Sequence, residues 1–193
     1  MRRARVMLNA AVYRLKHISD TDPFLPMEHV EHVLQLDPNI RVAIREDISE
    51  GGLPIEARVK FFKTGHQLLE ITERAGRAAI LGLPMARYAI AHEIGHINLH
   101  RRVMRTKVEG AARNFTGTNR KLRAQLHQET QGMENEADIY GGLLLVPLSI
   151  IDKDADYLEL ASRYNAPPLR VKQLRWDVME VWSTLMKLKR DRG

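Results

Sequence analysis

The chain has 193 residues, with 30 lysines and arginines against 24 aspartates and glutamates, which gives a formal net charge of +6. Hydrophobic residues make up 44% of it, enough for a sizeable core, so wholesale disorder is excluded. The absence of cysteine excludes disulfides and thiolate ligands, so any metal site must use histidine, aspartate or glutamate.

The first half of the chain predicts helices followed by a small sheet. An amphipathic helix is expected in the basic N-terminal segment, with Val6, Ala10, Leu15 and Ile18 roughly on one side. A turn at DPFLP precedes a second helix at MEHVEHVLQL. Candidate strands follow at 40–46, 57–63 and 67–72, separated by turns at SEGGLP and TGH, and a further short strand is expected at 77–83.

From about Met85 onward the pattern is helical, interrupted by prolines and by an irregular loop at 110–118. We expect one α+β domain over 1–193, in which the small sheet packs against a mainly helical core. Its parts are N-terminal helices at 1–36, the sheet at 40–83, and then the helical segments 85–101, 120–131, 133–146, 153–164 and 168–190.

No apolar run approaches the roughly 18 residues of a membrane span, and the longest, 141–151, contains Pro147. Arg14 and Lys16 interrupt the apolar part of the N-terminus, which argues against a secretory signal. We therefore expect a cytoplasmic protein without a membrane partner.

The segment AHEIGHINLH places three histidines four residues apart. On a helix, His92, His96 and His100 lie on one face, at about 0°, 40° and 80°. Isoleucines occupy the other side and are expected to pack on the sheet. The histidine face therefore needs something to bind, or is an ordinary helix surface.

His-Glu-x-x-His is a spacing with a specific chemistry. His92 and His96 project to the same side and can bind one Zn²⁺, while Glu93 lies beside the ion and can take a proton from bound water. His100, one turn beyond His96, is expected to support a ligand or face the substrate.

A later segment, MENEADIYGGLLLVP, offers the missing third ligand. On a helix, Glu134 and Asp138 share one side with the small residues Ala137 and Gly141, which would allow close approach to the histidine helix. Glu134 would then complete the zinc site, and Asp138 would accept a hydrogen bond from a ligand imidazole. Glu136 is expected to point away, and an amphipathic helix with exposed acids is the alternative.

These residues resemble the ImmA/IrrE-type metallopeptidases. RYAIAHEIGHINLH and ENEADIYGGLLLVP match the two specific helices of that family, and the order of elements agrees over about 40–175. The resemblance implies that His92, His96 and Glu134 are zinc ligands in a zincin-like core, that Glu93 is the catalytic base, and that Asp138 sits at an Asn/Asp position. It further implies cleavage of a helix–turn–helix repressor encoded nearby, often in stress-response loci or mobile elements.

A peptidase also needs a donor for the oxyanion. His100, Tyr140 and Tyr88 are candidates, although packing is the competing role for each tyrosine.

The basic charge leaves two further interpretations open. The segment 101–123 carries eight basic residues against Glu109, so Arg101, Arg102 and Arg105 could dock an acidic partner or a DNA-bound repressor. The alternatives to an enzyme are a catalytically inactive zinc fold that binds a partner in the manner of an antitoxin, and a DNA-associated regulator that makes weak nucleic-acid contacts.

Overall fold

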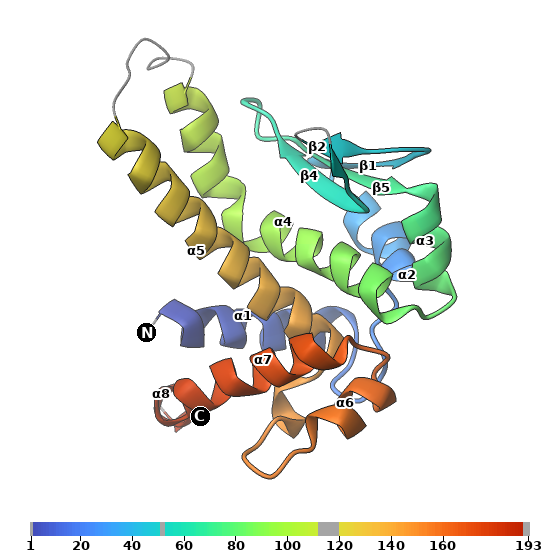
Figure 1. Cartoon of the computed structure of the whole chain (residues 1–193), viewed down its shortest axis with the longest axis vertical. Coiled ribbons are helices and arrows are strands. Elements are labelled where there is room, and N and C mark those ends of the chain that lie inside the picture. Colours follow the sequence, from blue (N-terminus) through green and yellow to red (C-terminus); the bar gives the residue numbers. More distant parts are fainter. Residues whose placement is uncertain (1, 51–52, 112–119, 191–193) are drawn as a thin grey trace.

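Eight α-helices accompany a small sheet in the part of the chain that the computed structural model describes, residues 2–50, 53–111 and 120–190 (Figure 1). Side chains are described within 2–49, 53–101 and 131–187. The helices are α1 (Arg2–His17), α2 (Pro26–His32), α3 (Glu73–Ile80), α4 (Pro84–Ala111), α5 (Arg120–Leu145), α6 (Tyr157–Arg163), α7 (Pro168–Glu180) and α8 (Trp182–Arg190). This order of elements confirms the predicted α+β class.

The main sheet is mixed. Its order is β1-β5-β4, with β5 pairing parallel to β1 and antiparallel to β4, and a separate two-stranded ladder joins β2 to β3. The strands are β1 (Ile40–Arg45), β2 (Ser49–Glu50), β3 (Leu53–Pro54), β4 (Ala57–Phe61) and β5 (Gln67–Thr72). The register places Val42 and Val59 on either side of Leu69, which is fully buried. One face of the sheet therefore contributes to the core.

Local sequence explains where the helices begin. Prolines open α2, α4 and α7, where the missing N–H costs no helical hydrogen bond. The Thr72 hydroxyl accepts a hydrogen bond from the Ala75 N–H at 3.1 Å, and the Asp156 carboxylate accepts one from the Leu158 N–H at 2.8 Å. Gly82 has a φ of +79°, a conformation that glycine adopts without strain, and it turns the chain from α3 into α4.

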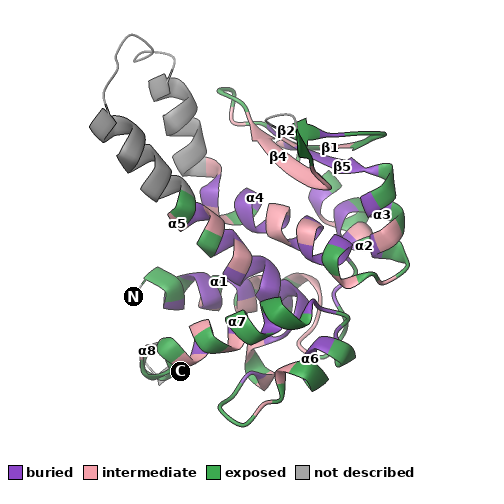
Figure 2. Ribbon diagram, viewed as in Figure 1, coloured by how far each residue is buried: buried purple, intermediate pink, exposed green. Residues whose placement is uncertain are grey.

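Helix α4 lies between the sheet and the lower helices, and α5 packs along it (Figure 1). On its other sides α5 contacts α1 and α7. Figure 2 shows the consequence, since the lower half of α5 is buried on several sides. Ile90, Ile94 and Ile97 on α4 are at most 4% exposed, as expected for its apolar side. The core thus places the histidine-bearing helix directly against α5.

Several element boundaries differ from the sequence prediction. The strand expected at 77–83 is wrong, because Thr72 caps a helix there and Ala75 and Ala79 bury one face of α3. The helices expected at 120–131 and 133–146 are one helix, α5, that runs through Gly132. The loop expected at 110–118 falls largely outside the described residues.

Two buried arginines join distant parts of the chain. Arg14 donates to the carbonyls of Asp22 and Leu144, and Arg87 donates to those of Phe24, Tyr164 and Asn165. Both side chains are at most 2% exposed, and the carbonyls compensate the terminal nitrogens, while the Nε of each arginine has no hydrogen-bond partner among the described residues. Leu15, expected on the buried side of α1, is instead 61% exposed, because Arg14 takes the inner position.

Within the described helices, none combines the length and apolar character that crossing a membrane requires.

Candidate metal centre

Two imidazoles on α4 and one carboxylate on α5 converge on one point. The Nε2 atoms of His92 and His96 are 3.0 Å apart. The two carboxylate oxygens of Glu134 lie 3.2 Å from His92 Nε2 and 3.4 Å from His96 Nε2. The three side chains therefore form a group that could hold a metal ion.

The donor set and its spacing suit zinc. A tetrahedral Zn²⁺ with bonds of about 2.0–2.1 Å keeps its donor atoms roughly 3.3 Å apart, close to the separations between these three groups. Two imidazole nitrogens and one carboxylate also leave a fourth position for water or substrate, as in catalytic zinc sites. The geometry therefore defines a candidate metal site.

Small residues allow α4 and α5 to approach this closely. A Cβ added at Gly141 would lie 2.8 Å from the His92 backbone nitrogen, and one added at Gly95 would lie 3.0 Å from the Ala137 carbonyl oxygen. Since neither backbone can give way easily, a side chain at either position would push the two helices apart. The glycines therefore set the distance across which Glu134 reaches the histidines.

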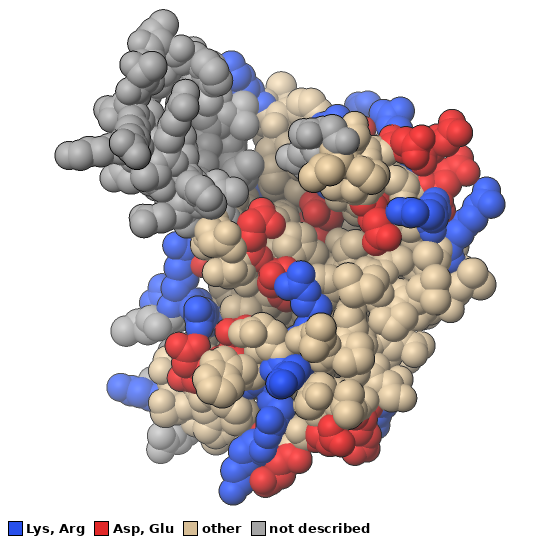
Figure 3. All heavy atoms as spheres, viewed as in Figure 1, with Lys and Arg blue, Asp and Glu red and all other residues tan. Residues whose placement is uncertain are grey.

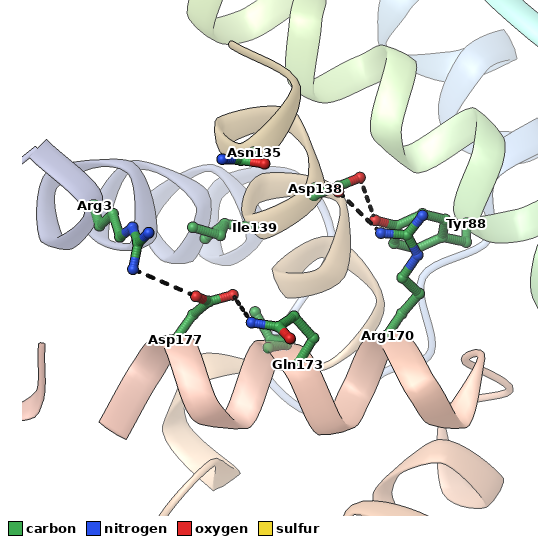
Figure 4. Close-up of a pocket in the computed structure, with 9 residues that line it drawn as sticks. Arg3, Tyr88, Asn135, Asp138, Ile139, Arg170, Gln173 and Asp177 are labelled. Atoms are coloured by element: carbon green, nitrogen blue, oxygen red, sulfur yellow. Dashed lines mark hydrogen bonds and ion pairs between the residues drawn. The ribbon is translucent and has the colours of Figure 1, made fainter. Parts of the chain in front are cut away.

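Asp138 orients the first histidine. Its Oδ1 is 2.9 Å from His92 Nδ1. The same Oδ1 accepts the Tyr88 hydroxyl at 2.6 Å, and Oδ2 accepts Arg170 Nη1 at 2.9 Å (Figure 4). The Arg170 guanidinium also lies 4.9 Å from the centre of the Tyr88 ring. Burial would raise the pKa of Asp138, but the bonds to His92 and Tyr88 hold that pKa below its ordinary value. With Nδ1 bound in this way, His92 turns Nε2 toward Glu134.

Hydrogen bonding makes His92 basic when no metal competes for its nitrogen. Burial lowers the pKa of His92, yet the bonds to Asp138 and Glu134 outweigh it and raise that pKa to about 9. The bond from His92, together with the nearby His96, lowers the pKa of Glu134. A metal ion must therefore displace a proton from this site.

The second histidine is supported through a third. His96 Nδ1 lies 3.0 Å from His100 Nδ1, and His100 Nε2 lies 3.1 Å from Glu136 Oε2. His100 is 2% exposed and Glu136 is 8% exposed. Glu136, expected to point away from Glu134, is buried against His100 rather than free in solvent.

Glu93 points toward the sheet side of the site. Its Oε2 accepts the backbone N–H of Val59 on β4 at 2.7 Å. Burial raises the pKa of Glu93, although the nearby His92 and His96 lower it. The carboxylate is thus held next to both histidines by a strand edge, a contact that the sequence alone did not suggest.

The remaining candidates lie elsewhere or have other partners. The Tyr88 hydroxyl is bound to Asp138, and Tyr140 is buried beside Tyr13, with ring centroids 6.0 Å apart. Arg101 lies 3.4 Å from Asp37. The side chains of Arg102 and Arg105 fall outside the described residues.

A cavity of about 290 Å³ lies behind Asp138, between α1, α5 and α7 (Figure 4). Its charged groups pair with one another: Arg170 with Asp138, and Arg3 with Asp177 at 3.6 Å. On the face drawn in Figure 3, basic and acidic side chains are likewise interspersed among the described residues.

Comparison of the chain with protein-family models, curated proteins and solved structures gives no match.

Proposed function

We propose that this chain is a zinc-dependent endopeptidase of the ImmA/IrrE type, and that it cleaves a regulatory protein, a helix–turn–helix repressor. The observation that supports it most is the convergence of His92, His96 and Glu134, with Glu93 beside them. The sequence resemblance provides the substrate class.

In the proposed mechanism, His92, His96 and Glu134 would hold the ion. Bound Zn²⁺ supplies Lewis acidity and lowers the pKa of water to about 7. Because the Val59 N–H binds Oε2 of Glu93, Oε1 is free to accept the proton of the attacking water. Glu93 then passes this proton to the leaving amide nitrogen.

The outer edge of β4 can align an extended peptide. The Val59 N–H points away from β5 toward Glu93, and strand alternation directs the backbone groups of Ala57 and Phe61 to that same edge. An extended segment that pairs there would pass beside Glu93. A repressor would need a flexible or extended segment to be cleaved.

The test uses the purified chain, loaded with zinc, and the repressor encoded beside its gene. We expect cleavage by the parent chain that a chelator stops and that added zinc restores. Glu93→Gln should bind zinc as the parent does and lose about 10²–10⁴-fold in cleavage rate. Metal content by atomic absorption serves as the control for loading.

Regulation separates the enzyme from its alternatives. If Glu93→Gln still relieves repression in cells, the chain acts by binding and the peptidase proposal is wrong. A chain that relieves repression without cleavage, with an affinity for DNA that falls steeply with salt, would support the DNA-associated alternative.

A further inference from the structure

The support behind His96 is a buried chain of side chains from three helices. It runs from His96 through His100 on α4 to Glu136 on α5, and then to Arg2 on α1, whose Nη2 donates to Glu136 Oε2 at 3.1 Å. Only its far end is open to solvent, since the Arg2 side chain is 74% exposed. His100 is therefore buried against His96, and it does not face a substrate.

The donor and the acceptor of each hydrogen bond in this series of side chains follow from its end at Glu136 and Arg2. The Glu136 carboxylate, which already accepts from Arg2, also accepts from His100, so His100 Nε2 carries a proton. A neutral His100 then has a lone pair on Nδ1, and the facing His96 Nδ1 must donate to it. That leaves His96 Nε2 without a proton, pointing at Glu134.

We propose that His100 and Glu136 are positioning residues that fix the tautomer and orientation of His96, as Asp138 does for His92. Both ligand histidines would then be supported by a carboxylate of α5, one directly and the other through an intervening imidazole. The inference depends on the metal site of the proposed function and not on peptidase activity. The reverse proton arrangement would put a hydrogen on His96 Nε2 and block that ligand atom.

The direct test is the histidine tautomer in the metal-free chain. Long-range ¹H–¹⁵N correlation spectra at pH 8 distinguish a proton on Nδ1 from one on Nε2, with assignments from single histidine variants. We expect His96 to carry its proton on Nδ1 in the parent and to lose that preference in Glu136→Ala. A parent protein with the His96 proton on Nε2 would overturn the proposal.

The second test is zinc affinity, measured by competition with a chromophoric chelator. Glu136→Ala should weaken it about 10-fold or more. Glu136→Gln keeps an oxygen that can accept from His100 and should recover most of the loss. Glu180→Ala removes a different carboxylate from an ion pair with α1, that of Arg3, and should change affinity less than about twofold.

Folding is checked by urea unfolding of each variant. An unchanged zinc affinity in a folded Glu136→Ala variant would contradict the proposal, as would an equal loss in Glu180→Ala. If the parent shows the Nδ1 proton on His96 but never cleaves a repressor, the proposed function fails and the positioning role stands. The two failures are therefore distinguishable.

Discussion

The Asp138 carboxylate binds Tyr88, His92 and Arg170. Its bond to His92 is the one expected to affect metal binding. Asp138→Asn keeps the shape of the side chain but removes the charge that orients the imidazole and holds Arg170. We expect zinc affinity to fall about 10–100-fold, measured by chelator competition. Asp154→Asn, which alters an exposed acid far from the histidines, is the control and should bind zinc like the parent.

His29 on α2 makes stability depend on pH at a place unrelated to the metal. It is 5% exposed and lies 2.8 Å from the Tyr13 hydroxyl, and burial, with a smaller effect from His17, lowers its pKa from 6.5 to about 4. Between these values the unfolded chain binds more protons than the folded one. Stability is therefore lost as the pH falls from 6.5 toward 4, by at most about 3 kcal/mol.

The measurement is the free energy of unfolding by urea across this pH range, with a chelator present. His29→Gln removes the titrating group and should flatten the dependence. His32→Gln, on the same helix but exposed, should leave the slope unchanged. Equal slopes in all three proteins would contradict the assignment to His29.

At the scale of elements, the contact between α4 and α5 depends on two glycines, of which Gly141 has the closer neighbour. Gly141→Ala would place a Cβ 2.8–2.9 Å from the His92 backbone, so the helices must separate. We expect a loss of about 1–3 kcal/mol in unfolding free energy together with weaker zinc binding. Gly132→Ala, in the same helix, meets nothing within 4 Å and should stabilise the chain by about 0.5–1 kcal/mol.

Periodicity predicted the elements that have a strong local pattern. The strands at 40–45, 57–61 and 67–72, the apolar side of α4 and the small-residue seam of α5 follow from the local residue pattern. The strand predicted at 77–83 was wrong because a short apolar run does not distinguish a strand from a buried helix. The hydrogen bond from the Ala75 N–H to the Thr72 side chain favours the start of a helix there.

The sequence predicts those parts of the site that follow from residue spacing within single helices. The ligand group follows from the spacing on α4 and the carboxylate on α5. The role of Glu136 could not be predicted from the sequence. A helical wheel gives the direction of a side chain but not the residue that lies next to it. Because α5 is buried against α1 as well as α4, an acid that faces away from Glu134 still meets His100. Val59 and Arg170 likewise come from elements whose packing the sequence does not specify.

At the scale of the molecule, a bound metal should hold α4 to α5. Helix α4 packs on the sheet and α5 packs on α1 and α7, so the metal should stabilise the whole fold. Zinc that binds only the folded chain stabilises it by about 2.7 kcal/mol at 100 times its Kd. For a chain of this length each kcal/mol raises Tm by about 2–4 °C, so we expect an increase of about 5–10 °C. Calorimetry with and without zinc measures it, and His96→Ala should abolish the increase.

The buried arginines have a consequence for how this sequence can change. Arg14 and Arg87 recognise carbonyl groups, which every amino acid carries, so these bonds do not themselves select the side chains at 22, 24, 144, 164 and 165. The arginines themselves are far less replaceable, because a lysine ammonium cannot present the same planar fork to carbonyls of separate segments. The bonds therefore oppose substitution of the two arginines, while packing is what restricts the buried residues that they bind.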